Sequence, residues 1–463
     1  MLIEQLYTNC LAEAAYYIES DGEAAIIDPL RETNPYLEKL ESRRVKLKYV
    51  FETHFHADFV SGHIDLANKT GAQIIYGPEA NTKYKVHNAV DGEEFKVGKL
   101  TITALHTPGH TLESTCYLLC DEFGKDYCIF TGDTLFVGDV GRPDLLDGVM
   151  TKEELASKMY DSLNNKIKTL HDDVIVYPAH GPGSACGKSM GKETFSTIGI
   201  QKKTNYALQE MTREEFIEQV TDGLSKPPQY FFEDARINKN GYDNIDTVID
   251  QNNKGLDITA FENAVQNGAI ILDTRTADQF EKAFIPNSLN IGLNGMFAVW
   301  VGTLVDITKP LVLITEPGKE EESILRLARV GYEKVTGFLD GGIETWVNAG
   351  KEVKNVQSIN AEEISVFYGQ PEYIILDVRK PSEFETEHIK GAINIQLSEI
   401  ENRLNELDKN KKYIVHCAAG YRSMMAASIM KQHGLNNFVN VYGGWGAIKR
   451  TELPKESSVP ELA

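Results

Sequence analysis

The chain has 463 residues, which is too many for one ordinary hydrophobic core, so two or three domains are expected. Its 42% hydrophobic and 25% charged residues are typical of a soluble globular protein. A formal net charge of −21 argues against nucleic acid or an anionic membrane as a partner. The six cysteines are too scattered for a disulfide framework, which favours reduced thiols and a cytoplasmic location.

Short strands alternate with helical stretches in the first part of the chain. Strands are predicted at 24–28, 46–52, 73–76, 100–105, 115–119, 127–132 and 174–177. Amphipathic helices are predicted at 62–69 and 151–170, and Thr151 with Glu154 is a capping box for the second. Residues 188–250 are polar and helix-rich. This order predicts sheets with helices on their outer faces, closed by a helical appendix in a first domain over 1–250.

A group of histidines and aspartates follows the predicted strands. The motif T-H-F-H-A-D-F-V-S-G comes directly after the strand at 46–52. The candidates are His54, His56, Asp58, His110 in T-P-G-H-T, Asp133 in T-G-D-T-L-F and His180 in Y-P-A-H-G. Imidazoles and carboxylates at strand ends can point at one centre, and they are the usual ligands of a catalytic transition metal. Surface histidines in a loop would not be accompanied by matching partners downstream.

This ordered set resembles the metallo-β-lactamase superfamily over residues 1 to about 190. The resemblance implies an αββα sandwich. In the two-metal hydrolases of that superfamily the first motif is H-x-H-x-D-H, whereas Phe59 stands here where the last histidine belongs. A second metal would lack an imidazole and face an apolar ring, which counts against a dinuclear hydrolase.

Within that superfamily, T-H-F-H-A-D-F-V-S-G-H together with G-R-P-D-L resembles the persulfide dioxygenases, which use one Fe(II). The resemblance implies that the ligands are His54, His110 and Asp133. Two histidines and one carboxylate leave coordination positions open for a thiolate-like sulfur and O2 side by side. The resemblance places His56, Asp58 and His180 nearby, where they either orient ligands and shuttle protons or serve only in hydrogen bonding.

Two further residues near this site have open roles. Arg142 follows Asp133 by nine residues, and the arginine of this motif helps to hold the carrier thiol in the resembling family. The alternative for Arg142 is an ion pair with Asp139 or Asp144. Cys186, in G-P-G-S-A-C-G-K, is either a sulfur relay or an inert loop thiol.

A repeat occupies the rest of the chain. A-I-I-L-D-T-R, from residue 269, matches Y-I-I-L-D-V-R, from residue 373, and the aspartates Asp273 and Asp377 lie 104 residues apart. The repeat predicts two homologous α/β domains, over 256–353 and 359–455. Each begins with a buried strand, which predicts a parallel sheet with helices on both faces.

The second repeat contains Y-I-V-H-C-A-A-G-Y-R-S, in which a strand ends at Cys417 and a helix begins after the loop. Inward-facing loop amides and a helix amino terminus favour a thiolate and stabilise an anionic persulfide, and Arg422 adds positive charge. With the D-V-R and G-G-W motifs this resembles a rhodanese, which implies that Cys417 and Arg422 are catalytic. The first repeat has Thr315 at the cysteine position and three glutamates, 320–322, so we predict an inactive spacer.

The predicted fold class is α/β and α+β multidomain, a metallo-β-lactamase αββα sandwich followed by two rhodanese-like α/β domains. The predicted enzyme uses one Fe(II) per chain to oxidise a low-molecular-weight thiol persulfide with O2 to sulfite. Cys417 then transfers sulfane sulfur to sulfite, giving thiosulfate in sulfide detoxification. The alternatives are a dinuclear-metal thioester hydrolase of the glyoxalase II type and rhodanese repeats that only carry sulfur to a partner.

One long run without charges, 283–305, contains proline, asparagines and glycines, so it is a poor membrane span. We expect its part at 296–305 at an interface with the metal domain or with a second chain, which favours a homo-oligomer.

Overall fold

The computed structural model describes residues 1–145, 149–224 and 226–458. The chain divides into two compact units. The first consists of Met1–Val248 with Leu325–Tyr332, and the second of Ile249–Ile324 with Glu333–Ala463. In the described part of the chain, no helix has both the length and the apolar composition needed to cross a bilayer.

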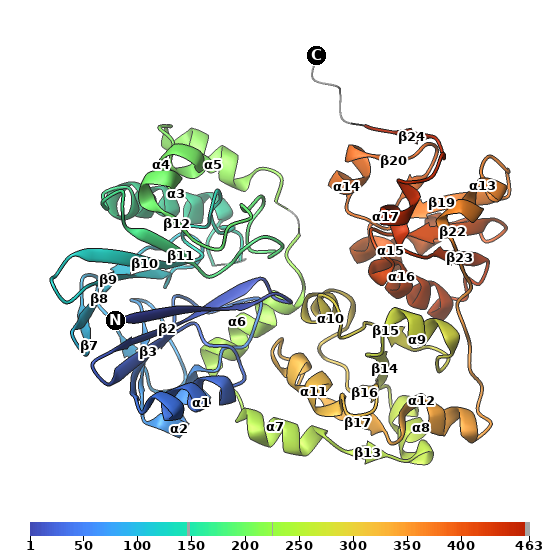
Figure 1. The fold of residues 1–463 in the computed structure, drawn as a ribbon, viewed down its shortest axis with the longest axis horizontal. Helices are drawn as coiled ribbons and strands as arrows, with labels where there is room; N and C mark the ends of the chain where they lie inside the picture. Colours follow the sequence, from blue (N-terminus) through green and yellow to red (C-terminus); the bar gives the residue numbers. More distant parts are fainter. Residues whose placement is uncertain (146–148, 225, 459–463) are drawn as a thin grey trace. The chain divides into compact units, whose positions relative to one another are not determined.

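The first unit contains two six-stranded sheets, and Figure 1 shows α1 and α2 outside one sheet and α3 to α5 outside the other. The first sheet has the order β1 (Leu2–Thr8), β2 (Glu13–Ser20), β3 (Glu23–Ile27), β4 (Lys46–Phe51), β5 (Gln73–Tyr76) and β6 (His87–Asn88). The second has the order β12 (Ser196–Thr197), β11 (Ile175–Pro178), β10 (Asp126–Gly132), β9 (Thr115–Cys120), β8 (Leu100–His106) and β7 (Glu94–Val97). This arrangement confirms the predicted αββα sandwich.

The main core of the first unit lies between its two sheets. Strand β2 is buried on both faces, because Tyr16 belongs to the core between the sheets and Tyr17 packs beneath α1 and α2. The Tyr16 hydroxyl donates a hydrogen bond of 2.6 Å to the carbonyl of Pro178, at the end of β11. Alternating side chains of a single strand therefore serve two cores, as the pleat of a covered sheet requires.

The helices of the first unit follow the sequence prediction in part. They are α1 (Asn34–Arg43), α2 (His63–Thr70), α3 (Lys152–Ser162), α4 (Ile198–Thr204), α5 (Arg213–Thr221), α6 (Tyr230–Asn240) and α7 (Ile245–Asn252), the last of which continues into the second unit. The predicted capping box of Thr151 and Glu154 is present. The helix predicted over 151–170 ends as α3 at Ser162, where a π-helical turn, Leu163–Ile167, follows. Strands β1 and β2 and helix α1 were not predicted.

The second unit contains two five-stranded sheets, each with its strands parallel. Their orders are β13 (Gly255–Leu256), β17 (Val335–Leu339), β16 (Leu311–Ile314), β14 (Ile270–Asp273), β15 (Leu289–Asn290), and β18 (Ser358–Ile359), β23 (Phe438–Val441), β22 (Lys412–His416), β19 (Tyr373–Asp377), β21 (Ile393–Asn394). A short sheet pairs β20 (His388–Ile389) with β24 (Lys455–Glu456). The predicted parallel sheets are confirmed, whereas the predicted domain boundaries stay predictions.

The helices of the second unit connect these parallel strands. They are α8 (Ile258–Gln266), α9 (Ala277–Lys282), α10 (Phe297–Leu304), α11 (Glu320–Ala328), α12 (Gly342–Asn348), α13 (Ile364–Phe367), α14 (Pro381–Thr386), α15 (Ile400–Arg403), α16 (Tyr421–Gln432) and α17 (Gly444–Ile448). Helix α11 begins in the second unit, and its last residues group with the first unit.

The repeated residues make the same contacts in both repeats. Asn290 Nδ2 donates to the carbonyls of Asp273 and Arg275. Asn394 Nδ2 donates in the same way to the carbonyls of Asp377 and Arg379. The strand-end pair also recurs, because each arginine binds the buried aspartate two residues before it. These residues thus hold the end of the first long strand of each repeat to the strand beside it.

Replacing Arg379 by alanine leaves Asp377 buried without its main partner. Asp377 is fully buried, and the guanidinium contacts its carboxylate at 2.6 Å. We expect a loss of about 3–5 kcal/mol in the free energy of unfolding of the second unit. Arg403→Ala is the control, because its ion pairs with Glu399 and Glu406 are exposed and contribute about 0–1 kcal/mol. Equal destabilisation of the two variants in denaturant titrations would show that the buried pair adds no more stability than an exposed one.

Candidate metal centre and sulfur-transfer loop

The predicted ligands lie just beyond the ends of different strands of the first unit. His54 follows β4, His110 lies in the loop between β8 and β9, and Asp133 follows β10 directly. All three are buried, with at most 2% of their surface exposed. Their ligand atoms lie within 4.8 Å of one another. His110 Nε2 is 3.4 Å and His54 Nε2 is 4.0 Å from Asp133 Oδ2, so the structure brings the predicted set together.

Hydrogen bonds determine which nitrogen of each ring faces the centre. The Thr53 hydroxyl donates to Asp28 Oδ2 at 2.8 Å and therefore accepts from His54 Nδ1 at 2.9 Å. His110 Nδ1 donates to the carbonyl of Arg142 at 2.8 Å. Burial, together with the neighbouring histidines, lowers the pKa of His54 well below its usual range. His54 therefore presents an unprotonated Nε2 to Asp133, and His110 turns its Nε2 toward the same carboxylate.

The atoms that face this centre fit a cation. Among the described residues, His54 Nε2, His110 Nε2 and both carboxylate oxygens of Asp133 have no hydrogen-bond partner. A buried polar group without a partner costs about 1–3 kcal/mol, and more when it is charged. A divalent metal bound by these atoms would satisfy all three residues at once. Two imidazoles and one carboxylate are the ligand types of non-heme iron and of zinc.

His56 lies in a different group of side chains. Its Nε2 is 3.1 Å from Asp28 Oδ1 and 3.6 Å from Glu52 Oε2. Burial and the charge of Asp28 raise the pKa of Glu52 well above its usual range. The Phe59 ring packs on His56 with 4.3 Å between ring centroids. His56 is thus turned toward two acids at the end of β3 and β4, beside the predicted ligands.

Asp58, His180 and Cys186 form a third buried group, and their potential ligand atoms lie within 4.8 Å of one another. His180 Nε2 is 3.4 Å from Asp58 Oδ2 and 3.6 Å from Asp133 Oδ1. Burial lowers the pKa of His180, but Asp58 and Asp133 together outweigh it, so the net shift is upward. Burial raises the pKa of the Cys186 thiol well above its usual range, which keeps this thiol protonated.

Arg142 forms an ion pair with Asp144, which is the alternative role predicted for it from the sequence. Its Nε and Nη2 donate to the two carboxylate oxygens of Asp144 at 2.6 and 2.8 Å. Nη1 donates to the carbonyl of Ala185 at 3.2 Å, and the Arg142 amide donates to the carbonyl of Cys186 at 2.9 Å. Asp139 instead accepts from the amides of residues 188 and 189. Substrate binding by Arg142 stays a prediction.

Three residues that shape the metal centre were missed from the sequence. Asp28 and Thr53 set the orientation of His54. Asn238, on α6, donates from Nδ2 to the carbonyls of His56 and Phe59 at 2.8 Å each. Asp28 had a detectable signal, because it is an acid at the end of a predicted strand. Asn238 is far away in the sequence and had none.

In the second unit, Cys417 is buried at the end of β22, just before α16. The amide of Gly420 donates to Cys417 Sγ at 3.2 Å. The amide of Trp445 donates to the Cys417 carbonyl at 2.7 Å. A Cβ on Gly444 would lie 2.3 Å from that carbonyl oxygen, and its φ is +50°. The G-G-W motif thus lets the chain approach the cysteine loop closely.

Arg422 is paired, which changes the expectation of an added positive charge on the loop. Its Nη1 and Nη2 donate to the two oxygens of Glu383 at 2.6 and 2.8 Å. Burial raises the pKa of Glu383, but the Arg422 pair outweighs it, so the carboxylate remains charged. The loop charge is therefore largely compensated. In the first repeat, the Thr315 hydroxyl donates to Glu320 at 3.3 Å.

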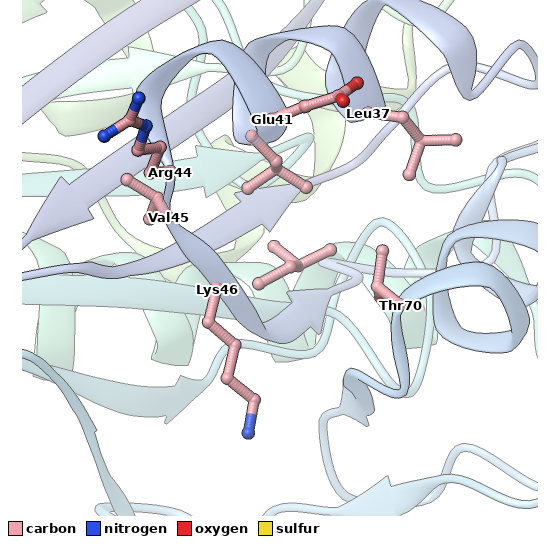
Figure 2. Close-up of a pocket in the computed structure, with 8 residues that line it drawn as sticks. Leu37, Glu41, Arg44, Val45, Lys46 and Thr70 are labelled. Carbon is pink, nitrogen blue, oxygen red and sulfur yellow. The ribbon is translucent and has the colours of Figure 1, made fainter.

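A surface hollow of about 430 Å³ lies apart from these groups. Figure 2 shows it between the end of α1, the start of β4 and the end of α2. Its lining consists of Leu37, Leu40, Glu41, Arg44, Val45, Lys46, Leu47 and Thr70. None of these is a predicted site residue, so this hollow has no connection with the chemistry described here.

Comparison with known families agrees with this geometry. Residues 8–180 match the metallo-beta-lactamase superfamily. A metallo-beta-lactamase from Staphylococcus aureus subsp. aureus COL is 30% identical, with a TM-score of 0.65 over 73% of this chain and 98% of that one. The chain belongs to the metallo-β-lactamase superfamily. It also carries two rhodanese-like domains, matched at 257–349 and 360–451. Membership of these families makes it an enzyme whose first domain has a metal-binding fold.

Other relatives have more specific names. A probable hydroxyacylglutathione hydrolase of Schizosaccharomyces pombe is 34% identical over 185 residues, which are 39% of this chain and 68% of that protein. ETHE1 from Myxococcus xanthus is 30% identical, with a TM-score of 0.45 over 52% of this chain and 98% of that one. The match to the hydrolase covers only the first part of this chain, so it does not extend to the rhodanese-like domains.

Replacing Thr53 by valine removes the hydroxyl that accepts from His54 Nδ1 and donates to Asp28. We expect the metal affinity to fall about 10–100-fold, because the ring orientation of His54 is no longer held. Competition with a chelator, followed by elemental analysis, measures the change. Thr204→Val is the control, because the Thr204 hydroxyl only bonds its own helix at the surface. Unchanged metal affinity in Thr53→Val would show that the hydrogen bonds from Asp28 through Thr53 to His54 do not support metal binding.

Proposed function

We propose that the first domain is a persulfide dioxygenase with one Fe(II) held by His54, His110 and Asp133. The main observation in support is that these three residues have four buried potential ligand atoms, none of which has a hydrogen-bond partner in the described structure. Phe59 supports a single metal, because it stands where the two-metal hydrolases have a further histidine and it packs on His56. His180 Nε2 lies 3.6 Å from Asp133 Oδ1, and we assign it, with Asp58, to proton transfer rather than to the metal.

The proposed reaction converts RSSH, O2 and H2O into RSH and sulfite with release of two protons. The sulfane sulfur is oxidised to sulfite while O2 is reduced. Held by His54, His110 and Asp133, Fe(II) would supply the Lewis-acid and redox chemistry for the reaction of the persulfide with O2. Asp58 and His180 stand 3.4 Å apart beside Asp133 and take up the proton that the persulfide loses.

We propose that the last domain transfers sulfur through Cys417. The thiolate attacks the sulfane sulfur of a second persulfide, which releases RS⁻ and leaves a Cys417 persulfide. Sulfite then attacks the outer sulfur, giving thiosulfate and regenerating the thiolate. The Gly420 amide, at 3.2 Å from Sγ, supports this role because it stabilises negative charge on sulfur. The first repeat has Thr315 at that place and takes no covalent part.

Thioester hydrolysis is a second candidate for the first domain. The observation that favours it is the 34% identity to a probable hydroxyacylglutathione hydrolase. A two-metal hydrolase needs a further imidazole where this chain has Phe59, and Phe59 packs on His56 instead. Persulfide oxidation is therefore the better-supported proposal.

Metal loading and oxygen uptake separate the two candidates. The protein reconstituted anaerobically with Fe(II) is expected to hold one iron per chain and to consume O2 only when a persulfide is added. Removing the iron with a chelator stops uptake, and adding Fe(II) restores it. Glutathione persulfide, coenzyme A persulfide and a hydroxyacyl thioester are the substrates to compare. Two metals per chain, with thioester hydrolysis and no O2 uptake, would establish the hydrolase instead.

Cysteine variants follow the path of the sulfur. Cys417→Ser is expected to release sulfite at the wild-type rate and to form no thiosulfate, because the covalent carrier is gone. Cys186 lies close to Asp58 and His180. A lowered thiosulfate yield with continued sulfite formation in Cys186→Ala would identify Cys186 as the sulfur relay considered from the sequence. Cys120→Ser is the control. A Cys417→Ser protein that still forms thiosulfate would refute the transfer route, and a normal yield in Cys186→Ala would refute the relay.

A further inference from the structure

Three residues on one face of α16 bond to the first rhodanese-like repeat. The Tyr421 hydroxyl donates to the carbonyl of Gly292 at 2.6 Å. The Ser428 hydroxyl accepts from the amide of Asn290 at 3.2 Å. Gln432 Nε2 donates to the carbonyl of residue 287 at 2.8 Å. Spacings of seven and four residues place all three on one helix face, so the first repeat runs along the helix that begins at the sulfur-transfer loop.

Two glycines of the first repeat enclose the Tyr421 ring. A Cβ on Gly295 would lie 2.5 Å from the ring carbon Cζ, and one on Gly292 would lie 3.5 Å from Cε2. The Gly295 position thus has no room for a larger residue unless the ring moves. Both glycines belong to the charge-free run of the sequence. Part of that run therefore packs within the pair of rhodanese-like repeats, while the interface predicted for 296–305 stays a prediction.

Tyr421 directly follows the residue that contacts the reactive sulfur. Gly420 donates its amide to Cys417 Sγ and has a φ of +101°. A Cβ on Gly420 would meet nothing within 4 Å, and its carbonyl is held only from within α16, by the Met424 amide at 3.2 Å and the Ser423 hydroxyl at 3.1 Å among the described contacts. A glycine in this region of φ rotates easily unless its neighbours are anchored. The hydrogen bond from Tyr421 to Gly292 and the close packing of its ring on Gly295 anchor the residue next to Gly420, whose amide faces the sulfur.

We propose that the catalytically silent repeat positions the sulfur-transfer loop through Tyr421. Tyr421 is a positioning residue: it holds the Gly420 amide at the sulfur, and its own side chain points away to Gly292. The role rests on the proposed sulfur transfer at Cys417. Residues 256–353, predicted from the sequence to be an inactive spacer, would then also position the sulfur-transfer loop. A threonine at position 315 is compatible with this task, because only the Gly292–Gly295 segment is required.

The test compares three variants of the full-length protein. Tyr421→Phe removes the bond to Gly292, and Gly295→Ala displaces the ring. Gln432→Ala removes a bond of the same interface eleven residues further along α16, away from the loop. The first two variants are expected to lower kcat for thiosulfate formation about tenfold with KM for sulfite nearly unchanged, since the loss of one half-buried hydrogen bond acts on the loop. Gln432→Ala is expected to behave like the wild type.

A second readout does not depend on sulfur transfer. The rate at which iodoacetamide alkylates Cys417 at pH 7, measured by mass spectrometry of its peptide, reports how well the loop favours the thiolate. We expect it to fall several-fold in Tyr421→Phe and Gly295→Ala and to be unchanged in Gln432→Ala. Alkylation as fast as in the wild type in both loop variants, or an equal loss in Gln432→Ala, overturns the positioning role. A wild-type protein without thiosulfate formation refutes the proposed function, while the alkylation rates still decide this inference.

Discussion

The orientation of one imidazole connects the fold of the first unit to its chemistry. Asp28 directly follows β3, Thr53 lies just beyond β4, and the hydroxyl of Thr53 joins the carboxylate to His54 Nδ1. The same aspartate accepts from the Thr53 amide at 2.8 Å and faces His56 Nε2 at 3.1 Å. One carboxylate therefore turns His54 toward Asp133 and keeps His56 on its own side. The number of imidazoles at the metal centre depends on this division.

Contacts with other parts of the first unit hold the loop that carries His54 and His56. The Ser61 hydroxyl donates to Glu52 Oε1 at 2.6 Å, and Asn238 holds the backbone of the loop that carries His56. A loop held in this way does not need the metal to stay in place. The centre is thus preorganised, and the binding energy of the metal is not spent on ordering the chain.

The two repeats of the second unit share their structural contacts but differ at the residue after the central strand. Both repeats keep the strand-end pairs of aspartate and arginine and the asparagine that joins two strands, because these contacts maintain the sheet. Only the second has a cysteine directly after its central strand, β22. The first repeat lacks the reactive group but provides the surface on which α16 lies. The contacts that maintain the sheet are therefore separate from the residue that follows the central strand.

Sequence alone determined the elements with strong local signals. Buried runs such as 46–51 and 127–132 became strands β4 and β10, and the Thr151 capping box begins α3, because period and capping are local properties. Strand β2 was missed because its two tyrosines face different cores and show no alternation. The candidate ligands were found because each follows a strand. Tertiary structure decided their partners: the turn of His56 toward Asp28, the pairing of Arg142 and Arg422, and the glycine slot for Tyr421. Such contacts depend on packing, which no local pattern encodes.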